Sequence, residues 1–200
     1  MKKVFISTVS ALLVSSAVFA DCQYKQEGTV DVAFKAYKTP LKIGVGGQFD
    51  DVKYINDVKS AKDLQALLIG SKVTIDTASV NSANEKRDKK LVTFFFDTMA
   101  QKGISAKIID LKVDKNDADS KTLSGVVSVD IKMNNVFHEA QLKFNYENGV
   151  FKADGFIDLA DYGALASLAS INKACYELHQ GKTWSDVAVS FTTNIAVDCK

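Results

Sequence analysis

Alternation of apolar and polar residues runs through most of this chain and restricts it to β structure. The pattern is clearest where Val127, Val129, Ile131 and Met133 alternate with polar neighbours. A strand repeats every two residues, so a segment of this kind has one dry face and one wet face. The following segment, Val136 to Tyr146, repeats the pattern, and Glu147-Asn148-Gly149 then predicts a tight hairpin turn because Asn and Gly accept positive φ angles.

Eight predicted strands follow one another along the chain. They are Thr29–Tyr37, Lys42–Tyr54, Lys72–Val80, Ile104–Lys115, Val127–Met133, Val136–Tyr146, Val150–Leu159 and Asp186–Val197. Helices are predicted at Ser60–Gly70 and Ala164–Leu178, while Ala83–Met99 is interpreted as helical or irregular. The predicted fold class is all-β: an eight-stranded antiparallel up-and-down barrel with two or three short helices, which closes on itself and so removes exposed sheet edges. A β-sandwich is the competing interpretation.

The first 20 residues form a predicted secretory signal peptide. Lys2 and Lys3 precede an uncharged, mostly apolar run, and the small Ala20 closes the segment. The run is about 15 residues long, against the ~20 that a helix needs to span a bilayer. We therefore expect export, cleavage after Ala20 and no stable membrane insertion. Residues 21–200 contain no Pro-, Gly- or Ser-rich linker and are expected to form one domain.

Three cysteines remain after cleavage, which is an odd number for a chain that enters an oxidising compartment. Cys22 begins the first strand and Cys199 ends the last. In a closed antiparallel barrel those two strands are neighbours of opposite direction, so their ends meet. We favour a Cys22–Cys199 disulfide that leaves Cys175 free; the two pairings with Cys175 are the alternatives.

Charge and motif content exclude several function classes. The mature chain has 23 basic and 24 acidic side chains, so its net charge of −1 does not suggest a nucleic-acid partner. The sequence shows no catalytic motif of the hydrolase, zinc-protease or nucleotide-binding types and no zinc-ligand spacing. We expect neither an enzyme, nor a bound metal, nor a required cofactor.

Aromatic residues and a few polar ones are the candidates for a ligand site. His138 occupies an inward position of an apolar strand face, as either a core histidine or a polar anchor in a cavity. Arg87 is the only arginine, and a guanidinium offers a fork of donors that lysine lacks; a turn network with Asp88 is the other interpretation. The aromatic candidates for an apolar cavity are Phe34, Phe94, Phe95, Phe144, Tyr146, Tyr162 and Trp184.

Several short motifs resemble those of the YceI-like family of exported bacterial proteins. They are Thr77-x-Ser79-Val80, Arg87-Asp88-x-x-Leu91, Phe95-Phe96-Asp97, Leu123-x-Gly125 and Asp161-Tyr162-Gly163, in matching order over roughly residues 30 to 163. The resemblance implies a lipocalin-like barrel in a Gram-negative periplasm, with a long isoprenoid or fatty-chain lipid in its cavity. It also makes Arg87 and Asp88 candidate polar contacts with that ligand.

The expected function is therefore a carrier for a long apolar ligand such as an isoprenoid, an isoprenoid quinone or a fatty-chain lipid. The first alternative is an envelope stress or interaction protein with a filled barrel and no ligand. A lipid hydrolase or isomerase that uses His138 is the second alternative, and a homodimer stays open.

Overall fold

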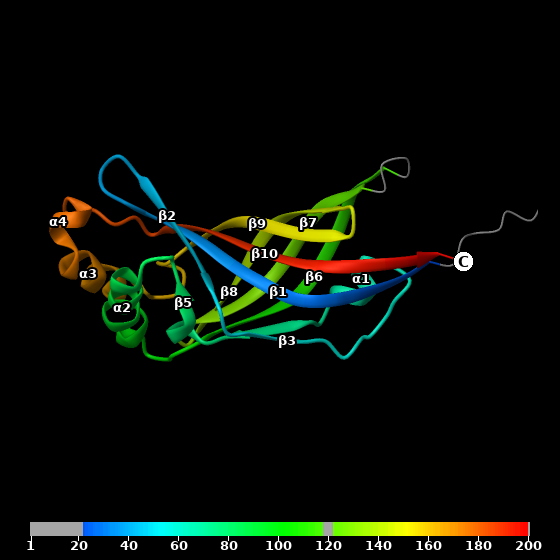
Figure 1. Cartoon of the computed structure of the whole chain (residues 1–200), viewed down its shortest axis with the longest axis horizontal. Helices are drawn as coiled ribbons and strands as arrows, with labels where there is room; N and C mark the ends of the chain where they lie inside the picture. The colour runs from blue at the N-terminus through cyan, green and yellow to red at the C-terminus, as the bar shows by residue number, and fades with distance from the viewer. Residues whose placement is uncertain (1–21, 118–121, 200) are drawn as a thin grey trace, which may run out of the picture.

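The computed structural model describes residues 22–117 and 122–199 as an antiparallel sheet curled around one core, with helices at both ends (Figure 1). The predicted signal peptide, residues 1–20, lies outside these ranges. The strands of the described residues are β1 (Cys22–Lys38), β2 (Ile43–Phe49), β3 (Val52–Ile55), β4 (Lys72–Ile75), β5 (Val80–Asn81), β6 (Ile104–Asp117), β7 (Thr122–Met133), β8 (Val136–Glu147), β9 (Val150–Asp158) and β10 (Asp186–Cys199). The order across the sheet is β3-β4-β6-β7-β8-β9-β10-β1-β2-β5.

Ten strands appear where eight were predicted because two predicted strands are interrupted. The segment 42–54 pairs with β1 as β2 and, after a bend at Asp50 and Asp51, pairs with β4 as β3. The segment 72–80 pairs with β3 and β6 as β4 and then pairs with β2 as β5. The two interrupted strands therefore still pair with each other and with both neighbours. The eight-stranded meander closes, and each of the two extra strands is the second half of a broken one.

Short helices cover both ends of the curled sheet. At the end that holds the chain terminus in Figure 1, α1 (Leu64–Leu68) is capped by Asp63 and buries three leucines. The opposite end carries α2 (Glu85–Phe94), α3 (Leu165–Ala174) and α4 (Tyr176–His179) (Figure 1). The predicted helix 60–70 is shorter than expected, and the predicted helix 164–178 is interrupted at Cys175, whose backbone leaves the helical region.

The strand alternation predicted from sequence is confirmed on the inner face of the sheet. Along β8, Ala140, Leu142, Phe144 and Tyr146 are buried while the residues between them are exposed. The hairpin after β8 turns through Asn148 at φ 52° and Gly149 at φ 80°, the positive angles that a two-residue turn requires. The inner faces of all the long strands thus enclose one apolar core.

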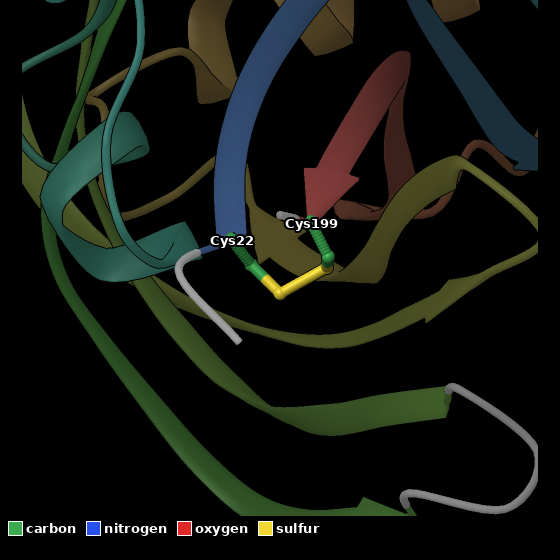
Figure 2. Close-up of a disulfide and its surroundings, with 2 residues drawn as sticks. All are labelled: Cys22 and Cys199. Carbon is green, nitrogen blue, oxygen red and sulfur yellow. A yellow bond between two sulfur atoms is a disulfide. The ribbon is translucent and has the colours of Figure 1, made fainter. Parts of the chain in front are cut away.

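A disulfide joins the first and last strands, as predicted. Cys22 and Cys199 are directly opposite each other in the β1–β10 ladder, and their sulfur atoms are bonded (Figure 2). The bond closes a loop across 177 positions of sequence. In the chain-entropy view such a loop contributes roughly 4 to 5 kcal/mol of stability by restricting the unfolded chain. Cys175 is buried and free.

Gly125 lets the paired strands β6 and β7 approach each other closely at a β-bulge. The β6–β7 register shifts between Val113 and Lys115, and Gly125 faces that shift. A Cβ atom at position 125 would lie 1.9 Å from the main-chain oxygen of Lys112. Because the neighbour is backbone rather than a flexible side chain, the strands would have to separate.

We predict that Gly125→Ala lowers the free energy of unfolding by about 3 kcal/mol, within the usual cost of overpacking. Gly46→Ala is the matched control, because its added Cβ would meet its nearest neighbour at an ordinary 3.7 Å. Urea denaturation followed by circular dichroism measures both variants. Equal stability of the two would contradict the bulge argument.

Candidate functional site

An apolar cavity of about 120 Å³ lies inside the curled sheet. Every strand except β5 contributes to its wall. Its larger lining side chains are Phe34, Phe49, Tyr54, Ile75, Ile104, Ile108, Ile131, Met133, Leu142, Ile157, Val189 and Phe191. A dry cavity needs only about 10 to 15 Å³ to admit one water molecule, so this space is many times that minimum. It is an unfilled part of the core with walls suited to hydrocarbon.

The cavity occupies one half of the interior and the other half is filled. On β8 the boundary falls between Leu142, which lines the cavity, and Phe144, which stacks on Phe151 with ring centroids 5.1 Å apart. Beyond Phe144 the core is closely packed and includes the leucines of α1. The hollow half is therefore the half nearer to α2, α3 and α4.

A row of aromatic rings connects the helical end with the cavity. Phe95 packs edge-on against Phe96 at 5.0 Å, and Phe96 packs against Phe49 at 5.9 Å. Phe49 then contacts Phe34 at 5.6 Å, and both of these rings line the cavity. Gly47 permits this arrangement, because a Cβ there would lie 2.6 Å from the ring of Phe34. The row is a continuous series of packed rings from the C-terminal end of α2 to the cavity.

The polar residues on the cavity wall are few and comprise Tyr54, Ser71, Lys72 and Ser190. The hydroxyl of Ser71 donates to the carbonyl of Leu68 at 2.7 Å. The hydroxyl of Tyr54 accepts from the amide of Asn56 at 3.2 Å, which leaves its own proton available. The wall can therefore recognise a hydrocarbon chain by shape and burial, with Tyr54 as its one aromatic hydroxyl.

The predicted ligand residues are spread over three regions of the structure. Phe34 lines the cavity, and Phe95 belongs to the aromatic row that leads to it. Phe144 and Tyr146 face inward but lie in the filled half, where the hydroxyl of Tyr146 donates to the carbonyl of Ile195 at 3.0 Å. Burial there raises the pKa of Tyr146.

Two aromatic candidates lie away from the cavity. Phe94 is the last residue of α2 and is partly exposed, whereas Phe95 and Phe96 after it are buried. Trp184 lies in the segment before β10, where its indole N–H donates to the carbonyl of Thr39 at 2.8 Å. Its ring contacts two lysines, Lys42 and Lys182, at 5.0 and 4.6 Å from the centroid.

Sequence reasoning missed Phe49, Tyr54 and Phe191, which contribute rings to the cavity wall. All three belong to segments that were predicted as strands. A consistent two-residue count would have found them, because Phe49 shares a strand face with Gly47 and Phe191 shares one with Val187 and Val189. The prediction selected aromatic residues by type and not by strand face.

Comparisons with known proteins identify the family. A family model described as "YceI-like domain" matches residues 24–198. The chain therefore belongs to the YceI-like family. No curated protein matches the sequence significantly.

Solved structures of low sequence identity share the YceI-like fold. A polyisoprenoid binding domain from Saccharophagus degradans has a TM-score of 0.58 at 15% identity, and the match covers 88% of this chain and 98% of that one. Burkholderia cenocepacia BcnA has a TM-score of 0.57 at 12% identity, with 84% and 96% covered. The Campylobacter jejuni YCEI protein has a TM-score of 0.51 at 19% identity, with 78% and 85% covered.

The Arg-Asp segment of this YceI-like chain forms a turn network around Ser82. Arg87 donates from Nε to the hydroxyl oxygen of Ser82 at 2.7 Å and from Nη2 to its carbonyl at 2.6 Å. Asp88 accepts from both the amide and the hydroxyl of Ser82. The two side chains hold the end of β5 against the start of α2. Arg87 and Asp88 do not belong to the cavity lining, and contact with a ligand stays a prediction for them.

Tyr162 of the Asp-Tyr-Gly motif anchors the return of the chain after β9. It is fully buried, and its hydroxyl points to the carbonyl of His138 at 3.5 Å. Burial, with Asp161 and Asp130 nearby, raises the pKa of Tyr162 to about 12. His138 itself lies near the start of β8 with 48% of its side chain exposed, and its Nε2 is 3.9 Å from a carboxylate oxygen of Asp161. The inward position predicted for His138 is therefore wrong, and His138 does not line the cavity.

Metal-ligating groups do not gather in residues 22–117 and 122–199. No cluster of three or more His, Cys, Asp and Glu side chains with ligand geometry occurs in that part of the chain. In the same residues no helix combines the length and apolar character needed to cross a membrane.

We predict that Arg87→Lys lowers the free energy of unfolding by about 1 to 3 kcal/mol, because lysine cannot make both bonds to Ser82 and leaves polar groups unpaired. Lys86→Arg, an exchange in the opposite direction at an exposed neighbouring position, is the control and should be neutral. Thermal and urea unfolding measure both. An unaffected Arg87→Lys protein would show that the network contributes nothing.

We predict that Tyr162 makes stability fall at alkaline pH. Unfolded tyrosine has a pKa of about 10, and the folded value is about 12, so the unfolded state loses this proton first as the pH rises between the two. The stability advantage of the wild type over Tyr162→Phe should shrink by about 2 kcal/mol between pH 9 and pH 11.5. Urea titrations at both pH values measure this. A constant difference would place the Tyr162 pKa near its ordinary value.

Proposed function

We propose that this protein binds one long apolar ligand inside the sheet, as a carrier and not as an enzyme. The observation that carries the proposal is the cavity, which has apolar walls from nearly every strand and lies in a core that is otherwise filled. Membership of the YceI-like family and the likeness to a polyisoprenoid binding domain support an isoprenoid or fatty chain as the ligand class.

The size of the cavity favours a thin, flexible ligand. Pockets for drug-sized molecules usually measure about 300 to 1,000 Å³, and this one is about 120 Å³. A single hydrocarbon chain fits such a space better than a fused ring system. Each CH₂ group transferred from water contributes about 0.8 kcal/mol, so each further carbon buried in the cavity helps to offset the association cost.

The polar end of the ligand is best placed at the helical end of the barrel. The filled half of the core blocks the other direction beyond Phe144 and Phe151. The aromatic row through Phe96 and Phe49 offers an apolar route between cavity and helices. In this arrangement burial supplies the affinity, while polar groups near α2 and α3 set the position of the head group.

The periplasm is the proposed location. Residues 1–20 have the pattern of a secretory signal peptide, and the Cys22–Cys199 disulfide agrees with an oxidising compartment. A carrier in that compartment would shield a water-insoluble chain between two membranes.

Native mass spectrometry of the purified protein, followed by organic extraction, tests the proposal directly. We expect a stoichiometric long-chain molecule to be released, or added geranylgeraniol or palmitate to bind at one per chain. A protein that is repeatedly empty and binds neither probe would instead favour the interaction protein with a ligand-free barrel.

A cavity-filling variant tests whether the ligand binds in the cavity. Ala106 lines the cavity, so Ala106→Phe should lower geranylgeraniol affinity at least tenfold by occupying the space. Ala196→Phe places the same ring on an exposed position of β10 and should bind as the wild type does. Intrinsic-fluorescence titration gives both affinities, and thermal unfolding confirms that both variants are folded. Unchanged binding by folded Ala106→Phe would move the ligand elsewhere.

A further inference from the structure

Exposed apolar side chains gather at the helical end of the molecule. Eight large apolar side chains are at least half exposed in the described residues, and five of them belong to the β1–β2 turn or to α3 and α4. These five are Leu41, Ile43, Leu165, Tyr176 and Leu178. We call Leu41, Ile43, Tyr176 and Leu178 the apolar tip. Leu41 is 82% exposed and Leu178 is 62% exposed, so neither contributes to the core.

Main-chain bonds hold the two segments of the apolar tip together. The amide of Thr39 donates to the carbonyl of Lys182 at 2.9 Å, and Lys38 pairs with Thr183 in an isolated β-bridge. Trp184 donates to the carbonyl of Thr39 and so ties the turn to the segment after α4. Both segments lie at the same end of the molecule, opposite the end marked C (Figure 1). The exposed side chains are therefore presented on a braced structure.

The charge around the apolar tip is positive. In residues 38–43 and 173–186, which carry the apolar tip, the basic side chains are Lys38, Lys42, Lys173 and Lys182. The acidic side chains of residues 38–43 and 173–186 are Glu177 and Asp186, and Asp186 is paired with Lys42 at 2.7 Å. These two ranges together have four positive and two negative charges. The described residues together have 21 basic and 22 acidic side chains, so the remainder is net negative.

We propose that the apolar tip docks on the surface of an anionic lipid bilayer. Exposed aliphatic side chains and a tyrosine inserted to head-group depth, with lysines around them, match the two attractions that such a surface offers. The proposal rests on the proposed function for its purpose, which is exchange of cargo with a membrane, but its chemistry is independent of it.

The position of the cavity agrees with docking at this end. Phe34 lines the cavity and is four residues from Lys38, which is about 13 Å along an extended strand. From Phe34 to Cys22 the strand runs twelve residues, about 40 Å, and that part of the core is filled. A chain that leaves the cavity therefore reaches the apolar tip by the shorter route.

Vesicle flotation with the full mature protein tests the proposal. Vesicles of phosphatidylglycerol and phosphatidylethanolamine are compared with vesicles of phosphatidylcholine alone. We expect binding to the anionic vesicles, at least tenfold weaker binding to the neutral ones, and a marked loss when salt is raised from 50 to 500 mM. Absence of binding to anionic vesicles at 50 mM salt would overturn the proposal.

Matched variants locate the surface. Leu41→Ser with Leu178→Ser should reduce vesicle binding at least tenfold, whereas Phe137→Ser with Phe156→Ser should change it less than twofold. The control pair is comparably exposed, at 62% and 61%, and lies on β8 and β9. Equal effects of the two pairs, or a loss of binding only in the control, would overturn the assignment. So would a change in oligomeric state in place of vesicle binding, since it would make the tip a protein contact.

Charge variants measure the electrostatic contribution to vesicle binding. Lys38→Gln with Lys173→Gln should weaken binding about tenfold or more at 50 mM salt, because each lysine near an anionic surface contributes about fivefold. Lys143→Gln with Lys152→Gln, on exposed positions of β8 and β9, should change it less than twofold. Equal losses in both pairs would show nonspecific attraction and contradict the proposal.

Geranylgeraniol binding in the absence of vesicles distinguishes the two proposals. Leu41→Ser with Leu178→Ser, and the two control pairs on β8 and β9, should retain wild-type affinity for this probe, because none of these residues lines the cavity or is a polar group of α2 or α3. Vesicle binding without probe binding would leave docking in place and remove the carrier function. Probe binding without vesicle binding would support the carrier function and contradict docking on a membrane.

Discussion

Closure of the sheet across the two broken strands is the constraint on which the rest of the structure depends. A long open sheet would expose two unpaired edges and its apolar face. Here each of the two broken strands is interrupted where the two edges of the sheet meet, one at Asp50–Asp51 and the other at Asp76–Ser79. The amide of Asp50 donates to the carbonyl of Ser79, and the amide of Asp76 donates to the carbonyl of Asp51, both at 3.1 Å. Because these bonds join the broken strands, the inner faces of eight strand segments can surround one interior.

A closed interior can be filled or left open, and this chain does both. Phenylalanines and the leucines of α1 fill the half next to the disulfide, while mostly aliphatic side chains leave space in the other half. The filled half, with the disulfide at its end, supplies stability. The hollow half lacks packing contacts, and unfilled space of this kind lowers the stability of the empty protein. This division is the physical basis of the proposal that a ligand binds in the interior.

A few side chains with specific hydrogen bonds fix the strands and helices that enclose this interior. Arg87 and Asp88 fix the end of β5 onto α2 through Ser82, and Tyr162 buries its ring where the chain returns after β9. Gly125 allows the β6 bulge. The residues at these motif positions therefore have structural roles, and the positions that line the cavity are mostly ordinary apolar residues.

Strand alternation, the Asn148-Gly149 turn, two helical segments and the Cys22–Cys199 pairing could all be predicted from the sequence, because each depends on local periodicity or on the order of neighbouring strands. The break of two predicted strands, the half-exposed position of His138 and the contribution of Phe49, Tyr54 and Phe191 to the cavity were decided by tertiary structure. A two-residue period tells which face a side chain takes but not how far along the barrel it lies. Whether an inward side chain meets packed neighbours or open space depends on what every other strand places at that level, and only the closed sheet determines it.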